Sequence, residues 1–142
     1  MKHLLLAVFL LISLPLAAQH AGPHFAAEGD HLAQRLAAFA LRENVADNDP
    51  RVVQADDWLA RAAAATGEED RAVAAACVRT AKFLLDGTRV KAHALEPLEA
   101  LATAARPGAT MSDGLMAYVR ARQQAPNKSH AEAMAALRGA GK

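Results

Sequence analysis

Apolar residues recur at intervals of three and four along most of the chain after residue 29. This period places them on one face of a helix, whereas a strand would alternate every second residue. Valine and isoleucine, which favour strands, are scarce, and alanine, the strongest helix former, is abundant. We therefore expect helices over approximately 30–45, 50–67, 67–86, 88–105, 112–124 and 130–138.

Residues with capping preferences mark several of the expected boundaries. Asp49 can cap the second helix, and Pro50 suits its first position. Thr66 with Glu69, and Ser129 with Glu132, have the spacing of capping boxes. Gly87 is expected to end the third helix in a left-handed conformation.

One expected helix contains its own interruption. Pro97 lies inside the apolar stripe of residues 88–105. A proline there removes an amide and clashes with the preceding turn, so we expect a kink or two shorter helices. Short helices joined by tight loops favour an all-α fold, a compact antiparallel bundle of about five or six helices. Residues 30–142 would form this single helical domain.

The first residues have the layout of a secretory signal peptide. Lys2 provides a basic start, an apolar stretch runs from Leu4 to Leu16, and Ala17 and Ala18 form a small-residue processing site. The stretch is shorter than the ~20 residues that a membrane-spanning helix requires, although an uncleaved anchor is the alternative. We expect residues 1–18 to be removed, residues 19–29 to form a flexible lead, and the protein to be exported, either periplasmic or secreted.

Composition changes this picture in one respect, the size of the core. The chain contains 37 alanines and only one Trp and one Tyr, although 53% of its residues count as hydrophobic. Alanine contributes far less on burial than leucine, which contributes about 1.5–3 kcal/mol. A sparse core makes self-assembly or a protein partner plausible, and the sequence predicts no stable membrane anchor after cleavage.

Charge excludes one class of partner. Without residues 1–18 the chain has 15 basic and 15 acidic side chains, so it lacks the basic stripe that nucleic-acid binding needs. Residues 19–86 carry a net charge of −4 and residues 87–142 carry +4. We expect these two halves to attract each other weakly across their interface, with a dipolar surface that steers a partner as the alternative.

Helical spacing also predicts which side chains are buried. Leu32, Leu36 and Phe39 lie along one side of the first helix. Cys77 recurs with apolar residues of the third helix and is expected to face the core as a free thiol, with an intermolecular disulfide as the alternative.

No recognised catalytic motif is present in the sequence. It has no Gly-x-Ser-x-Gly elbow and no glycine-rich phosphate loop. Glu96 and Glu99 form an acidic pair, which we interpret as solvated surface charges at a helix start rather than as an acid and base. The sequence predicts neither an enzyme nor a cofactor.

Histidine and methionine give the sharper alternative, which is metal or small-ligand binding. His20, His24 and His31 cluster near the expected new N-terminus, where imidazoles could hold Cu, Ni or Zn. His130 and Met134 lie one helical turn apart and could bind Cu(I), although a methionine at helical spacing is more often a core residue.

Trp58 is a candidate contact residue for a partner, because tryptophan is enriched at binding hot spots, with a core position as its alternative. From these observations we expect a small exported protein that is a non-enzymatic interaction module or that assembles with itself. A periplasmic protein that binds a metal or a small ligand through its histidines and methionines is the alternative function.

Overall fold

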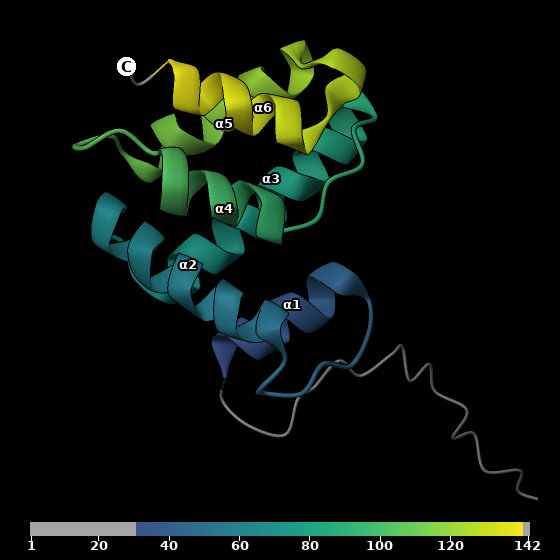
Figure 1. Cartoon of the computed structure of the whole chain (residues 1–142), viewed down its shortest axis with the longest axis vertical. Helices are drawn as coiled ribbons and strands as arrows, with labels where there is room; N and C mark the ends of the chain where they lie inside the picture. The colour runs from purple at the N-terminus through teal and green to yellow at the C-terminus, as the bar shows by residue number, and fades with distance from the viewer. Residues whose placement is uncertain (1–30, 141–142) are drawn as a thin grey trace, which may run out of the picture.

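Within residues 31–140, the fold consists of six α-helices and one short 3-10 turn (Figure 1). The structure is a computed structural model that describes residues 31–140. The all-α prediction is confirmed for these residues, while the expected signal peptide (1–18) and lead (19–29) lie outside them. The elements are α1 (Leu32–Leu41), α2 (Pro50–Thr66), α3 (Asp70–Thr88), α4 (Leu95–Ala104), α5 (Met111–Gln124), η1 (Pro126–Lys128) and α6 (His130–Gly139).

Helix α4 lies at the centre and packs against each of the other five α-helices. In Figure 1, α1 and α2 occupy the lower part of the molecule and α5 and α6 the upper part, with α4 between them. Two apolar clusters result. The larger includes Leu98 and Leu101 of α4 with residues of α1, α2 and α3. The smaller contains Ala100 of α4, Tyr118 and Val119 of α5, and Met134 of α6.

The two oppositely charged halves are not joined by ion pairs. Among the described residues, every ion pair joins two residues of the same half. The weak attraction expected between the halves thus has no direct ion pair behind it in this part of the chain, and it stays a prediction. Packing between α2 and α4, the most extensive helix contact, brings the halves together through apolar side chains.

One of the predicted helix caps is present in the structure, and two predicted capping boxes are not. Asp49 accepts a hydrogen bond from the Arg51 amide at 2.8 Å, and Pro50 occupies the first position of α2, as predicted. The Thr66 capping box is wrong, because the Thr66 hydroxyl donates to the Ala62 carbonyl inside α2 and Glu69 precedes α3.

The second predicted capping box is wrong as well. Ser129 precedes α6, but its side chain makes no capping hydrogen bond. A reciprocal capping box that the sequence analysis missed is formed instead by Thr110 and Asp113 at the start of α5.

Left-handed residues end two helices at places that differ from the prediction. Helix α1 ends at Leu41, four residues before the expected Val45, and Arg42, with φ 57°, follows the helix end. Val45 is nevertheless buried in the following turn, where its carbonyl accepts a hydrogen bond from the Gln34 side chain at 2.8 Å. Gly87 lies within α3, and Arg89, with φ 58°, follows the helix end.

Pro97 begins a helix and does not interrupt one. Residues 89–94 are non-helical, and α4 starts at Leu95. Pro97 is the third helical residue, where the backbone amide has no carbonyl partner within the helix. The predicted kink is therefore wrong, because proline is costly only further inside a helix.

Small residues decide how closely the helices approach. Phe39 is 55% exposed, contrary to prediction, and α1 buries Ala33 and Ala37 instead. At the α4–α5 contact, a Cβ atom on Gly114 would lie 2.7 Å from a methyl carbon of Leu101. A glycine at position 114 is thus what lets α5 reach α4.

Cys77 is fully buried, as predicted, and burial raises the pKa of its thiol from 9.0 to about 12. An unfolded chain loses this proton near pH 9 while the folded chain keeps it, so stability falls as pH rises from 9 towards 12. We expect the free energy of unfolding to fall by about 1.4 kcal/mol between about pH 8 and pH 10 from this group.

Urea denaturation at several pH values measures this loss. Cys77→Ala, which removes the thiol, should lack this part of the pH dependence. A stability difference between wild type and variant that stays constant over the same pH range would contradict the prediction.

Candidate functional site

A pocket of about 410 Å³ opens where α2, α4 and the start of α6 meet. Its volume falls at the lower end of the ~300–1,000 Å³ typical of small-molecule sites. Apolar and polar side chains both reach it. The apolar ones are Leu41, Pro50 and Leu95, with the indole of Trp58, and the polar ones are Arg51, Gln54, His93, Glu96, Glu99 and His130.

Helix α2 forms one wall of the pocket, and the hydrogen bonds that cap the start of this helix hold that wall in place. Asp49 accepts hydrogen bonds from both the backbone and the guanidinium of Arg51, and these bonds hold the pKa of Asp49 at about 2. Glu43 also pairs with Arg51. The guanidinium is therefore already matched by two carboxylates. Trp58 lies two helical turns along α2 and is half-buried against the larger apolar cluster.

The α4 wall carries two carboxylates on one face. Glu96 and Glu99 are three residues apart, so a helix presents them side by side. Both side chains are largely buried, at 15% and 23% exposure, and each has a cationic or imidazole partner. The expectation that they are solvated surface charges is wrong, because the loop before α4 and helices α5 and α6 cover them.

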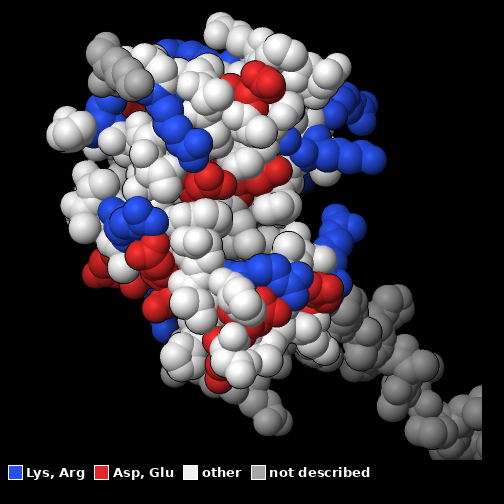
Figure 2. Space-filling view, in the orientation of Figure 1, with Lys and Arg blue, Asp and Glu red and all other residues white. Residues whose placement is uncertain are grey.

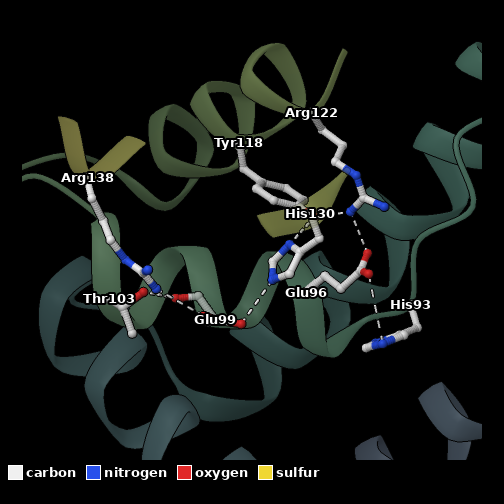
Figure 3. A network of polar contacts seen from close by, with 8 residues as sticks. All are labelled: His93, Glu96, Glu99, Thr103, Tyr118, Arg122, His130 and Arg138. Carbon is white, nitrogen blue, oxygen red and sulfur yellow. Dashed lines mark hydrogen bonds and ion pairs between the residues drawn. The ribbon is translucent and has the colours of Figure 1, made fainter. Parts of the chain in front are cut away.

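Arg122 holds Glu96 from behind the pocket (Figure 3). Its guanidinium donates to Glu96 Oε2 at 2.6 Å, to the Tyr118 hydroxyl at 2.6 Å, and to the backbone carbonyls of Lys91 and Lys128. Arg122 is only 5% exposed. Burial is the largest single effect and lowers the pKa of Arg122, but the hydrogen bonds and charges of Glu96 and Tyr118 together outweigh it and raise this pKa. The residue therefore remains a buried cation.

A directed chain of hydrogen bonds continues from Arg122. Because Tyr118 accepts from the guanidinium, its own proton is available for His130 Nδ1 at 2.9 Å. When Nδ1 accepts from Tyr118, His130 Nε2 carries a proton and can donate it to Glu99 Oε2, also at 2.9 Å. Burial, followed by the nearby Glu96 charge, raises the pKa of Tyr118 far above its usual value. Arg138 completes the network on Glu99 Oε1 at 3.3 Å.

A second and larger hollow of about 760 Å³ lies between α4, α5 and α6. Alanines form most of its wall, and its charged groups, such as Arg106 and Arg120, are separated from the network just described. Alanine methyl groups offer little with which to select a ligand. The pocket beside Trp58 is therefore the candidate functional site.

Two of the predicted site residues come together at this pocket. Trp58 and His130 are 72 positions apart in the sequence, and both line it. Met134, by contrast, is buried in the smaller apolar cluster, which agrees with the core alternative. His31 is exposed before α1, outside the pocket, and His20 and His24 lie outside the described residues.

Metal binding by these residues stays a prediction. Within residues 31–140, no three His, Cys, Asp or Glu side chains are grouped so that they could hold a metal ion.

Arg122 is the main residue that sequence reasoning missed. It lies four residues after Tyr118 and seven after Leu115, so it falls on the apolar stripe of its helix. A charged residue at such a position needs a buried partner, and that signal could have found it. Its partner Glu96 is 26 residues away in the sequence, and only the folded chain identifies it.

Comparison of the chain with protein-family models, with curated proteins and with solved structures finds no match in any of the three. Across the part of the chain that the structure describes, no helix is both long enough and apolar enough to span a membrane.

Proposed function

We propose that this protein binds a small molecule in the pocket beside Trp58 and that it acts as a binding protein without catalytic activity. One observation carries the proposal. A tryptophan, two carboxylates and two imidazoles converge on one pocket whose wall is held in place by the buried Arg122. Pockets that combine apolar surface with a few convergent polar groups are typical of ligand sites.

The state of the polar groups supports binding rather than catalysis. Both ring nitrogens of His130 are already engaged, one with Tyr118 and the other with Glu99. The raised pKa of Tyr118 keeps its hydroxyl protonated, so it is a poor base. No serine, threonine, cysteine or lysine is among the residues that line this pocket in the described part of the chain.

Fluorescence offers a direct test, because Trp58 is the sole tryptophan of the chain. Titration with phenethyl alcohol, a neutral aromatic probe, should change the Trp58 emission saturably. A probe of this size is expected to bind with a Kd on the order of 1 mM, or about −4 kcal/mol. An emission that changes only linearly with probe concentration would count against the proposal.

Binding of the same probe to variants can be measured by ligand-observed NMR, which does not need the tryptophan as a reporter. Trp58→Leu should weaken binding of the probe about tenfold, the equivalent of about 1.4 kcal/mol. Phe83→Leu is the matched control, since Phe83 is an exposed aromatic residue that does not line the pocket. Equal losses in the two variants would argue against a site at Trp58.

We also propose that the protein is exported, periplasmic or secreted, on the strength of the basic, apolar and small-residue pattern of residues 1–18. N-terminal sequencing of the exported protein should give Gln19 as the first residue. Recovery of the chain only with its first 18 residues would oppose this.

Self-assembly or binding of a protein partner is the second candidate function. Large apolar side chains that remain exposed support it, in particular Phe39, Val53 and Phe83, each more than half exposed. Size-exclusion chromatography with light scattering would test self-assembly, and a strict monomer at high concentration would argue against it.

A further inference from the structure

The two oxygens of Glu96 have different surroundings. Oε2 accepts the hydrogen bond from Arg122 at 2.6 Å, which fixes the carboxylate in the pocket wall. Oε1 lies 4.0 Å from Nε2 of His93, beyond hydrogen-bonding distance (Figure 3). Among the described residues, only one fully buried side-chain polar atom lacks a hydrogen-bond partner, and it belongs to Gln34. Glu96 Oε1 has no hydrogen-bond partner either, so it is not fully buried and remains accessible. It can accept a hydrogen bond from a ligand.

The charge of the pocket wall favours a cationic ligand. Glu96 and Glu99 contribute two carboxylates, and Arg51 contributes one cation that Glu43 and Asp49 already engage. Arg122 compensates the negative charge of Glu96 from the side away from the pocket, and Arg122 itself does not line the pocket. Among the residues that line the pocket, the carboxylates of Glu96 and Glu99 therefore outnumber the single guanidinium of Arg51. In the view of Figure 2, acidic atoms lie across the middle of the molecule, and both acidic and basic groups lie above and below them.

The remaining lining suits an apolar body attached to that charge. Trp58 has the aromatic face that attracts an ammonium or guanidinium group most strongly, within about 6 Å of the ring centre. Leu41, Pro50 and Leu95 provide hydrocarbon surface in the same pocket. Its volume of about 410 Å³ accommodates a compact molecule rather than a peptide helix.

We propose that the pocket is a site for an organic ammonium ion with a compact apolar or aromatic body. The ammonium group donates a hydrogen bond to Glu96 Oε1, and the body packs against Trp58 and Leu95. This inference rests on the proposed binding function and specifies its ligand class. It requires no covalent step, and both ring nitrogens of His130 keep their contacts with Tyr118 and Glu99.

Three probes with the same carbon skeleton test the charge preference on the full mature chain. Phenethylamine, phenethyl alcohol and phenylacetate are titrated separately, with Trp58 emission and calorimetry as readouts. We expect the amine to bind about tenfold more tightly than the alcohol and phenylacetate to bind most weakly. The amine preference should shrink as salt is added, since accessible charges are screened.

The charge of the pocket can also be changed at its rim. Such a substitution leaves Glu96 in place, whose loss would leave Arg122 unpaired. Gln54 is exposed and lines the pocket, so Gln54→Lys adds a positive charge there without touching the network. We expect amine affinity to fall about fivefold and alcohol affinity to fall by less. Gln123→Lys makes the same charge change at an exposed position of α5 that does not line the pocket, and should alter neither affinity.

The outcomes separate this inference from the proposed function. Equal binding of amine and alcohol, or tighter binding of phenylacetate, would overturn the ligand class while leaving a functional pocket. Failure of all three probes to bind at millimolar concentration would overturn both proposals. Amine-selective binding that Gln54→Lys weakens, and Gln123→Lys does not, would support both.

Discussion

Replacing Arg122 with methionine is expected to lower the free energy of unfolding by about 3–5 kcal/mol. Methionine fills a similar volume but donates no hydrogen bonds. Glu96 would lose its partner, the Tyr118 hydroxyl would lose a donor, and the carbonyls of Lys91 and Lys128 would be left without the guanidinium. Breaking a buried charge pair by removing one partner is costly, because the remaining charge stays where water cannot solvate it well.

Two further variants show whether the lost pairing causes this effect. Arg120→Met makes the same change at an exposed position of α5 and should alter stability by less than about 0.5 kcal/mol. The double variant Arg122→Met with Glu96→Gln should recover part of the loss, since the orphaned charge is then absent. Chemical denaturation followed by circular dichroism measures all three. Equal losses in the Arg122 and Arg120 variants would contradict the proposed role of the pair.

Leu98→Ala is the second substitution with a large expected effect, about 2–5 kcal/mol of destabilisation. Leu98 is fully buried on α4, the helix that contacts all the other α-helices. The larger cluster that surrounds it consists mostly of alanine and valine. Small neighbours have no long side chains that could turn into the cavity, so we expect the loss to lie in the upper part of this range.

Leu85→Ala is the matched control for that prediction. Leu85 is also helical but 44% exposed, so the gain in helix propensity is the same while no cavity forms. We expect a change below about 1 kcal/mol, measured by the same denaturation experiment. A Leu98→Ala loss as small as that of Leu85→Ala would mean that the cluster rearranges to fill the space.

The sequence correctly predicts features that depend on residues close to each other along the chain. Asp49 and Pro50 predict the start of α2 correctly, because a cap depends only on residues within one turn. Cys77 was placed in the core by its spacing from other apolar residues of α3. Period and propensity likewise predict an all-helical chain, which the structure confirms for residues 31–140.

Local signals failed where two interpretations competed within a few residues. Thr66 matches a capping box, yet its hydroxyl bonds within α2, whose end is set by the left-handed Gly67. Pro97 matches a helix breaker, yet it lies in the first turn of α4. In both cases the outcome depends on the position of the residue relative to a helix boundary, which the matching motif alone does not give.

By itself, therefore, the sequence determined the helices and much of their burial, because both depend on residues within a few positions of each other. The tertiary structure alone decided the site. It brings Trp58 of α2, Glu96 of α4 and His130 of α6 to one pocket, with Arg122 behind it. The physical reason is that a buried charge selects its partner by proximity in space, and proximity across 26 residues is set by how the helices pack.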